Sequence, residues 1–334
     1  MSLMVDDIYA QTIKMFGSHP EPAFENAAQL KAVWGREWGC DTDVGKLKTV
    51  LVHRPGSEFD VIDKTKRIES IGSYGDLEEG WYFQSDTIPD LSAMQVDHDG
   101  LVQTLKDEGV EVIMLEGEIS GRFKSCYIRD SSIAVKGGAI VSRLAAKMRR
   151  GEELCVTRTL ARYGVPILHT IHGTGMLEGG SFAWLNSSTA VVGRSIRVNN
   201  AGIEQLENTL KHQGVELIVT DLCGYNIHID QSFLMIDVNL ALVDAGNLAY
   251  DFLQQLKRLN IDSVEITPED DPWIINGLAV APGRVLMPPG MSARTLAELE
   301  RRNIEIIEIP YDSMQKNGGG IHCSTCPLIR EAVD

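Results

Sequence analysis

Short segments in which apolar and polar residues alternate recur along the chain from about residue 126, and each is followed by a turn and a second apolar segment. Alternation with a period of two is typical of a β-strand with one buried face, so each pair of segments predicts a β-hairpin. The expected hairpins cover residues 127–141, 181–193, 228–243 and 277–290.

Polar segments with helix-like spacing of apolar residues follow the hairpins and end before a strand rich in Ile and Val. The expected helices are 202–213, 246–259 and 291–302, and the strands after them are 215–219, 261–266 and 304–309. Residues 110–115 and 165–168 are the equivalent strands of earlier units, and residues 47–53 are predicted to be the first hairpin strand of an opening unit.

The pattern is therefore a repeat, because successive hairpins lie roughly 46 to 52 residues apart, a period typical of propeller-like or solenoid folds. About five units of two strands, a helix and a strand would surround one pseudo-rotational axis. A doubly wound parallel sheet is the competing prediction for alternating strands and helices, but its strands follow helices singly, whereas here hairpins alternate with helices. We expect a single domain over residues 1–334, with an N-terminal extension at 1–40.

The formal net charge of -16 argues against nucleic acid as a partner, because phosphate binding requires a surplus of Lys and Arg. An acidic cleft would favour a cationic small molecule, although a solvated acidic surface accounts for most of this charge without any ligand. No apolar segment is long enough to cross a membrane, and the N-terminus lacks a signal-peptide pattern, so we expect a cytoplasmic protein without a membrane partner. A homo-oligomer is compatible with the sequence.

The strongest local signal is residues 317–327, in which three consecutive glycines precede His322 and Cys323. Glycines let the main chain approach a ligand closely, and a thiol directly after them suits a nucleophile. A zinc site at Cys323 and Cys326 would need a second ligand pair, which is not evident, and a thioredoxin-like dithiol would lie near an N-terminal strand–helix junction. A single nucleophile, Cys323, with Cys326 as a packing neighbour fits best.

A cysteine nucleophile needs a proton-transfer partner, and His228 together with Asp230 opens a predicted strand with both side chains on one face. Asp130 and Glu178 start two other hairpins. Taken singly, His228, Asp130 and Glu178 would each be read as an ordinary solvated or hydrogen-bonded residue. Equivalent positions of the repeat units converge on one axis, however, so we expect these side chains to share one site. Carboxylates that accept bidentate hydrogen bonds from a guanidinium would hold its central carbon in front of the sulfur.

These motifs resemble the guanidino-group-modifying superfamily, and within it arginine deiminase most closely. Residues 318–330 look like the Gly-rich, His-Cys-x-Thr-Cys-Pro terminus of that enzyme, and residues 43–56 look like its opening strand. Residues 83–89, followed by His98-Asp99, are similar to its substrate-covering segment, where Asp86 would contact substrate. The resemblance implies an α/β fold, a fivefold pseudosymmetric β/α-propeller of ββαβ units.

The resemblance also implies a role for each residue. Cys323 would form a covalent amidino intermediate, and His228 would protonate the leaving amine and then activate water. Asp130 and Asp230 would clamp the guanidinium, and Glu178 would orient His228. Arg149 and Arg197 resemble the pair that binds an α-carboxylate. The resemblance implies no metal and no organic cofactor, and the expected partner is a small guanidino substrate.

Several functions share this chemistry. The leading hypothesis is an amidinohydrolase that converts arginine or a substituted arginine to citrulline plus ammonia or an amine. An amidinotransferase would pass the same amidino group to an amine, and a non-catalytic guanidine-binding protein would retain the fold alone. Dimethylarginine hydrolases fit the spacing of His228 and Asp230 less well, and the chain has no room for the helical domain that arginine deiminases usually carry.

Overall fold

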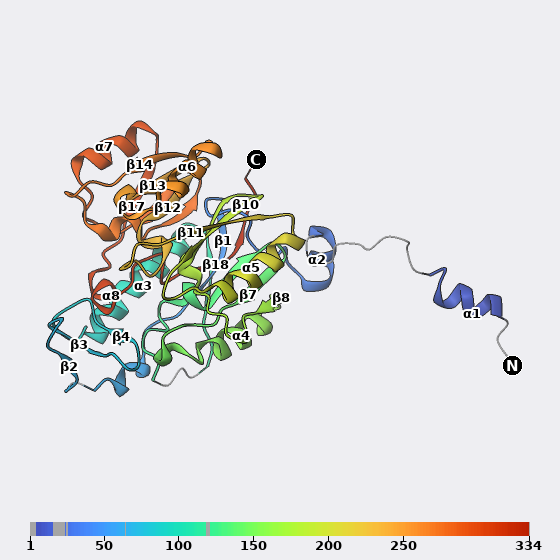
Figure 1. The fold of residues 1–334 in the computed structure, drawn as a ribbon, viewed down its shortest axis with the longest axis horizontal. Helices are drawn as coiled ribbons and strands as arrows, with labels where there is room; N and C mark the ends of the chain where they lie inside the picture. The colour runs from blue at the N-terminus through green and yellow to red at the C-terminus, as the bar shows by residue number, and fades with distance from the viewer. Residues whose placement is uncertain (1–4, 16–23, 25, 64, 118–120, 334) are drawn as a thin grey trace.

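The computed structural model describes residues 5–15, 24, 26–63, 65–117 and 121–333 (Figure 1). The expected N-terminal extension at 1–40 therefore lies partly outside the described residues. Its described helices are α1 (Val5–Thr12) and α2 (Ala27–Trp34). Leu30 of α2 packs in a buried cluster with Trp38 and Leu51, so this part of the extension contacts the core.

Within the described residues, five three-stranded sheets share one plan: the middle strand pairs antiparallel with one neighbour and parallel with the other. Four of them follow the chain order: β6 (Ser132–Val135), β7 (Gly138–Val141), β8 (Ile167–Thr170); β9 (Phe182–Asn186), β10 (Thr189–Arg194), β11 (Glu216–Asp221); β12 (Phe233–Asp237), β13 (Leu240–Val243), β14 (Asp262–Glu265); β15 (Leu278–Ala281), β16 (Arg284–Met287), β17 (Glu305–Glu308). The fold is thus mixed α/β with several small sheets, as the repeat predicts.

The fifth sheet joins the two ends of the chain. Strand β1 (Leu47–Val52) lies between β18 (Cys326–Arg330) and β5 (Glu111–Met114), antiparallel to the former and parallel to the latter. Residues 47–53 were expected to begin a hairpin, but β1 occupies the middle position and its hairpin partner comes from the C-terminus. A partner so distant along the chain leaves no local turn signal, which is why the sequence pattern missed it.

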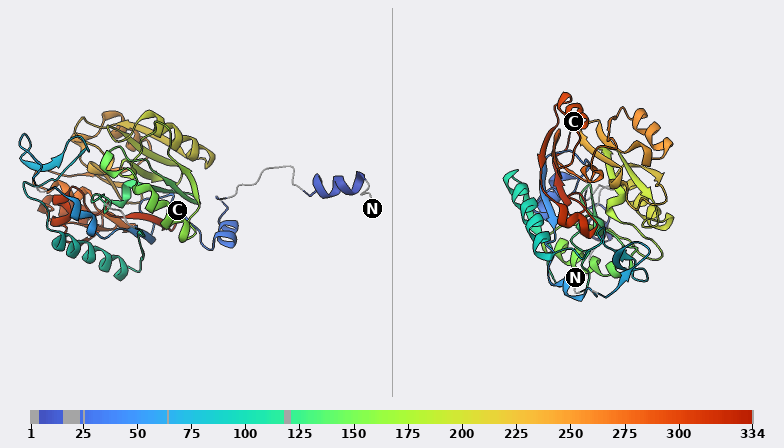
Figure 2. Two further views of the ribbon diagram at one scale, coloured as in Figure 1. Left: turned by 90° about the horizontal axis from the view of Figure 1, so that it is seen from below. Right: turned by 90° about the vertical axis from the view of Figure 1, so that its left-hand side faces the viewer.

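A helix precedes the strand that pairs in parallel with the middle strand of each of these five sheets. These helices are α3 (Leu91–Asp107), α4 (Glu152–Arg162), α5 (Asn200–His212), α6 (Tyr250–Arg258) and α7 (Ala293–Arg301). In both turned views α3 (teal) and α5 (olive) lie on opposite outer sides of the body, with strands between them (Figure 2). Along α5 the buried residues Ile203, Leu206 and Leu210 recur at helical spacing, so one stripe of the helix faces the sheets.

Neighbouring sheets contact one another through their antiparallel outer strands, except that β15 contacts the middle strand β1. Contacts join β9 to β12, β12 to β15, β15 to β1, and β18 to β6. The sheets that begin with β6 and β9 are connected through two short 3₁₀ helices, η2 (Ile128–Ser131) and η4 (Gly179–Ser181). These helices directly precede β6 and β9 and contact each other. Residues from both ends and the middle of the chain therefore meet on one side of these sheets.

The hairpins of two other sheets also follow short 3₁₀ helices: η5 (Ile229–Gln231) precedes β12, and η7 (Pro272–Ile275) precedes β15. The sequence predicted that His228 and Asp230 lie in a strand, but they lie at the start of η5, and Asp130 lies in η2. The Gln231 side chain accepts hydrogen bonds from the backbone N–H groups of Ile227 and His228, which closes the turn. His228 and Asp230 are therefore positioned by a turn and not by strand alternation.

The remaining elements lie between β1 and α3, directly before α4 and α6, and near the C-terminus. They are a small antiparallel sheet, β2 (Arg67–Ile68), β3 (Ser73–Asp76) and β4 (Trp81–Tyr82), the 3₁₀ helices η1 (Ser57–Val61), η3 (Lys147–Arg149) and η6 (Ala245–Asn247), and the short helix α8 (Asp312–Asn317). Among the described residues, no helix combines the length and the apolar character that a membrane span requires.

Candidate active site

The glycine loop that follows α8 brings Cys323 into a crowded interior position. Gly318 has a φ of 113°, which favours glycine. A Cβ on Gly319 would lie 2.5 Å from the ring of Tyr127, and one on Gly320 would lie 2.5 Å from Oδ1 of Asn276. The loop therefore packs its main chain directly against two side chains, which only glycines permit.

Two hydrogen bonds anchor the backbone of Cys323. Its N–H donates to Oδ1 of Asn276 at 3.2 Å, and its carbonyl accepts the N–H of Arg129 at 3.0 Å. Asn276 also donates through Nδ2 to the carbonyl of Asp230 at 3.3 Å. One buried amide thus connects the cysteine loop to η5, the turn that carries Asp230.

His228 lies between two carboxylates contributed by other repeat units. Its Nε2 donates to Oε2 of Glu178 at 2.7 Å, and its Nδ1 lies 3.6 Å from Oδ1 of Asp130. Gly180 donates its N–H to the same Asp130 oxygen at 3.1 Å. All three ionisable side chains are buried, so their charges depend on one another.

The charges of this group have clear physical causes. Burial alone would lower the pKa of His228, but Asp130 and the hydrogen bond to Glu178 outweigh it and raise the pKa to about 9. Burial would raise the pKa of Glu178, but the hydrogen bond from His228 and the charge of Arg197 lower it to about 2. At neutral pH, His228 is an imidazolium that can donate a proton from Nδ1.

Asp230 is in contact with the sulfur of Cys323. Its Oδ2 accepts a hydrogen bond of 2.8 Å from Nδ1 of His322 and lies 3.5 Å from Sγ of Cys323. Burial opposes ionisation of Asp230, but the hydrogen bond from His322 lowers its pKa. Burial, followed by the charges of Asp230 and Asp130, raises the pKa of the Cys323 thiol well above its usual value. A cation bound between these groups would reverse that effect and favour the thiolate.

Arg149 is buried in a second ionic group. Its Nε and Nη2 donate to the two carboxylate oxygens of Glu152, both at 2.9 Å, and Nη2 also donates to the carbonyl of Tyr127 at 3.0 Å. Nη1 donates to Asp130. Arginine has five N–H donors, so among the described contacts one N–H on Nη1 stays unused. By contrast, Arg197 makes one described carboxylate contact through its guanidinium, 3.4 Å to Glu178.

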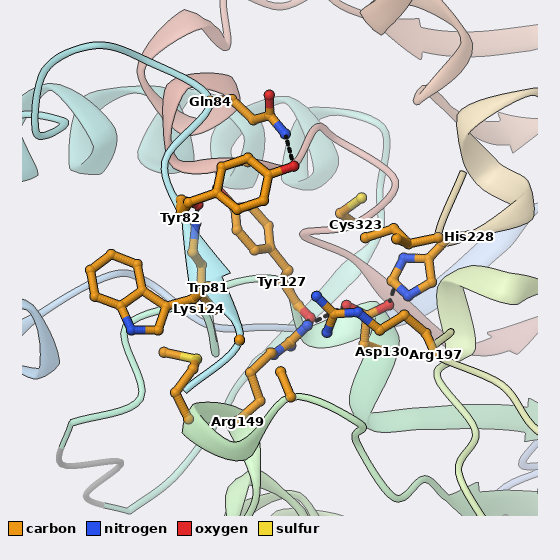
Figure 3. Close-up of a pocket in the computed structure, with 15 residues that line it drawn as sticks. Trp81, Tyr82, Gln84, Lys124, Tyr127, Asp130, Arg149, Arg197, His228 and Cys323 are labelled. Carbon is orange, nitrogen blue, oxygen red and sulfur yellow. Dashed lines mark hydrogen bonds and ion pairs between the residues drawn. The ribbon is translucent and has the colours of Figure 1, made fainter. Parts of the chain in front are cut away.

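These side chains surround a cavity of about 140 Å³, several times the roughly 30 Å³ that one water molecule occupies in the liquid. In the close-up, Cys323 and His228 lie to the right of the cavity, Lys124, Trp81 and Tyr82 lie to the left, and Arg149 lies below (Figure 3). Six of the predicted residues gather here: Cys323, His228, Asp130, Arg149 and Arg197 line the cavity, and Glu178 contacts His228. Asp230 does not line the cavity but contacts Cys323.

Asp86 is placed differently from the other predicted residues. It is exposed and does not line the cavity, and its backbone carbonyl accepts a hydrogen bond from Arg67. From the same segment, Gln84 lines the cavity together with Trp81 and Tyr82 of β4. Of the segment 83–89, Gln84 and not Asp86 lines the cavity.

Sequence reasoning missed Lys124, Tyr127 and Asn276. Lys124 and Tyr127 line the cavity, and Asn276 anchors Cys323. Tyr127 starts the first predicted hairpin and Asn276 directly precedes the fourth, so the convergence that selected Asp130 could also have selected them. Lys124 precedes the repeat and has no local signal that distinguishes it from a surface lysine.

Asp130, Glu178 and His228 also form the cluster that could hold a metal ion among the described residues, with ligand atoms within 4.8 Å of one another. Their atoms are already used, because Glu178 accepts hydrogen bonds from His228 and from the N–H of Ala145, and Asp130 from Arg149 and Gly180. A group so fully bonded suits proton transfer better than metal binding.

Comparison with known proteins agrees with this chemistry. Residues 84–330 match the family model described as N,N dimethylarginine dimethylhydrolase, eukaryotic. The N(G),N(G)-dimethylarginine dimethylaminohydrolase of Pseudomonas aeruginosa is 26% identical over 70% of this chain and 88% of that protein. An arginine deiminase of Latilactobacillus sakei subsp. sakei is 22% identical over 87% of this chain and 97% of that protein.

The fold has close structural counterparts too. The structure of an amidinotransferase of saxitoxin biosynthesis from Microseira wollei superimposes with a TM-score of 0.72, at 15% identity, over 89% of this chain and 98% of that one. The sequence motifs ranked dimethylarginine hydrolases below arginine deiminase, yet both are relatives, and the matching family model is that of the former. With about three quarters of its length matched, the chain belongs to the N,N-dimethylarginine dimethylhydrolase family, within the superfamily of guanidino-group-modifying enzymes.

Proposed function

We propose that this protein hydrolyses the guanidinium group of arginine or an arginine analogue through a covalent amidino–cysteine intermediate, giving citrulline or its analogue plus ammonia or an amine. The observation that carries this proposal is the meeting of Cys323, His228 and Asp130 at one cavity, with Glu178 and Asp230 bonded behind them. Oδ1 of Asp230 is buried and has no hydrogen-bond partner among the described residues, and a guanidinium could bond it while adding positive charge beside these carboxylates, which a neutral substrate could not.

The first half-reaction follows from the geometry. A guanidinium bonded to Asp130 and Asp230 would bring positive charge beside Sγ, and the thiol would release its proton to solvent as the cation binds. The thiolate then attacks the guanidinium carbon and forms a C–S bond. Because Nε2 of His228 is bonded to Glu178, Nδ1 is the nitrogen that donates a proton to the leaving amine as the C–N bond breaks.

The second half-reaction uses the same groups in reverse. His228, now neutral, accepts a proton from water, and the resulting hydroxide attacks the amidino carbon. The C–S bond breaks, the thiolate of Cys323 is regenerated, and the ureido product leaves. The fivefold β/α-propeller implied by the resemblance would explain how five units of a single domain, 1–334, supply these groups at one end of a common axis.

An amidinotransferase is the second candidate, favoured by the structural similarity to an amidinotransferase. Both reactions pass through a covalent amidino–cysteine, but a different C–N bond breaks in each. Hydrolysis to citrulline releases ammonia or an amine and keeps the rest of the substrate on the intermediate until water attacks, whereas transfer releases ornithine or its analogue and leaves only the amidino group, which an amine then attacks. A third candidate, a guanidine-binding protein without turnover, would bind the same cation and form no intermediate.

The test is product analysis by mass spectrometry after incubation with arginine, methylated arginines and further guanidino compounds, with and without glycine as an amine acceptor. Hydrolysis gives a ureido product without glycine, whereas transfer gives ornithine or its analogue only when glycine is present. Cys323→Ser should abolish both, while Cys326→Ser is the matched control, since Cys326 is buried against Ser132 and lies outside the cavity. Turnover that survives in Cys323→Ser would refute the mechanism, and binding of guanidino compounds without turnover or adduct would support the third candidate.

A further inference from the structure

The function proposed above gives no role to His322, although this residue directly precedes the nucleophile in the sequence. Its Nδ1 donates to Oδ2 of Asp230 at 2.8 Å, and the two side chains are only 8% and 3% exposed. His322 does not line the cavity. It would therefore act on a bound substrate only through another residue.

The main chain of His322 is fixed from two sides. Its N–H donates to the carbonyl of Asn276 at 3.0 Å, and its carbonyl accepts the N–H and the hydroxyl of Thr325, both at 3.1 Å. The imidazole therefore extends from a fixed backbone and presents its Nδ1–H at a defined place.

The two carboxylate oxygens of Asp230 have different surroundings. Oδ2 accepts the hydrogen bond from His322 and lies 3.5 Å from Sγ of Cys323, whereas Oδ1 is buried and has no partner among the described residues. A buried carboxylate oxygen without a donor costs free energy, so Oδ1 suits an N–H that arrives with a ligand. The bond to His322 opposes rotation of the carboxylate, which would exchange the two oxygens.

The groups around this pair favour an ionised Asp230 beside a neutral His322. Burial opposes ionisation of Asp230, but the hydrogen bond from His322 lowers its pKa, and the charges of His228 and Arg129 act in the same direction. Burial and the charge of Arg129 lower the pKa of His322 below its ordinary value. Asp230 and Asp43 oppose that shift without reversing it. At neutral pH the imidazole is therefore uncharged and carries its hydrogen on Nδ1.

We propose that His322 is a positioning residue of the proposed reaction: it holds Asp230 in one orientation and in its ionised form, so that Oδ1 stays free to bond the guanidinium beside Sγ of Cys323. The inference rests on the function proposed above and adds a residue that acts through Asp230 without touching the substrate. A hydrogen-bond donor is then required at this position, whereas an imidazole is not.

Two substitutions of nearly equal size test this role. The side-chain amide of His322→Asn can place an N–H near the position of Nδ1, whereas His322→Leu fills a similar volume without a donor. We expect kcat/KM to fall by about 100-fold in His322→Leu, as for a misplaced reacting group, and by less than about fivefold in His322→Asn. Equal losses in the two variants would overturn the proposal, because they would reflect packing alone.

The pH dependence separates loss of this hydrogen bond from general damage to the site. In His322→Leu, Asp230 stays buried without the donor, so its pKa rises and its negative charge is lost as the pH falls through the new value. The ratio of kcat/KM in His322→Leu to that in the wild type should therefore fall by about tenfold between pH 8 and pH 5.5, and His322→Asn should follow the wild type. A ratio for His322→Leu that does not change with pH would also overturn the proposal.

Binding separates this inference from the proposed hydrolysis. Titration calorimetry of arginine with Cys323→Ser, alone and combined with each His322 substitution, needs no turnover. With His322→Leu alone we expect the Kd for arginine to rise by about tenfold from pH 8 to pH 5.5. That result without turnover of any guanidino compound would refute the hydrolysis and support the inference. Equal pH dependence in all three proteins, with turnover intact in the wild type, would refute the inference alone, and absence of arginine binding to Cys323→Ser would contradict both.

A measurement on the wild-type protein does not depend on the folding of any variant. The ¹⁵N NMR signals of the His322 ring, assigned by their absence in His322→Asn, should show hydrogen on Nδ1 at pH 7. Hydrogen on Nε2 alone would overturn the proposal, since Nδ1 could then not donate to Asp230.

Discussion

The imidazole of His228 and the carboxylate of Glu178 form a buried hydrogen bond with 2.7 Å between Nε2 and Oε2. Glu178 also accepts the N–H of Ala145 at 2.8 Å and contacts Arg197. This carboxylate is therefore fixed from several directions, and it fixes the imidazole in turn. The ring can present only Nδ1 to a substrate, which assigns the proton donor of the proposed reaction to one atom.

Glu178→Gln should shift the pH dependence of activity. Without the carboxylate, the pKa of His228 falls, because the hydrogen bond and charge of Glu178 help to raise it to about 9. A lost charge-assisted hydrogen bond of about 1.5–3 kcal/mol corresponds to roughly one to two pH units. We expect the alkaline limb of kcat/KM to move to lower pH by about that amount. An unchanged alkaline limb in Glu178→Gln would show that another group controls it.

The same pair predicts how stability depends on pH. The folded pKa of His228, about 9, lies above its ordinary value of 6.5, so its contribution is complete below about pH 6.5 and is lost as the pH rises through 9. The folded pKa of Glu178, about 2, lies below its ordinary 4.5, so its contribution is present above about pH 4.5 and is lost as the pH falls through 2. The Tm of the wild-type protein should therefore fall more between pH 6.5 and 9.5 than that of Glu178→Gln, by a few degrees. Parallel Tm curves would contradict this assignment.

Gly180→Ala should impair catalysis more than folding. A Cβ at this position would lie 2.8 Å from both Oδ1 of Asp130 and Nδ1 of His228, so both groups must move. Displacements of about 1 Å can reduce rates by about 100-fold, and we expect a loss of kcat of that order. Gly100→Ala in α3 is the control, because a Cβ there meets nothing within 4 Å, and it should stabilise the helix by about 0.5–1 kcal/mol. Nearly full activity of Gly180→Ala would show that the site tolerates this shift.

Asp230→Asn should make Cys323 more reactive toward a neutral alkylating reagent. The thiol pKa is raised by burial and by the charge of Asp230, so removal of that charge favours the thiolate. Iodoacetamide labelling at pH 8, measured by peptide mass spectrometry, should be several-fold faster at Cys323 in the variant. The exposed Cys223 serves as the internal standard and should react at the same rate in both proteins. Slower labelling of Cys323 in Asp230→Asn would mean that Asp230 assists deprotonation.

Glu152→Ala should strongly destabilise the protein. Glu152 is fully buried and bonds Arg149 through both carboxylate oxygens, so its removal leaves a buried guanidinium with only part of its partners. Such losses cost about 3–5 kcal/mol in the free energy of unfolding. Asp221→Ala is the matched control, because Asp221 bonds Arg194 in a similar geometry on the surface, where an ion pair contributes about 0–1 kcal/mol. Urea denaturation of both variants compares the two losses, and equal losses would contradict the difference in burial.

The sequence by itself determined the repeat and its elements. The expected helix at 202–213 is α5 at Asn200–His212, and the expected strand at 304–309 contains β17 at Glu305–Glu308. Helical and strand periodicity are local properties, so they can be recognised in a single segment. The same holds for the glycine loop before Cys323, because three adjacent glycines mark a close main-chain approach wherever the loop lies.

The tertiary structure decided the contacts on which chemistry depends. It placed β18 beside β1, and it positioned His228 and Asp230 by a 3₁₀ turn. It also brought Arg149 into hydrogen bonds with Asp130 and Glu152. It also brought Lys124, which no local pattern marks, into the cavity wall. Hydrogen bonds and charge interactions between residues far apart in sequence depend on distances of a few ångströms, and only the folded chain sets those distances.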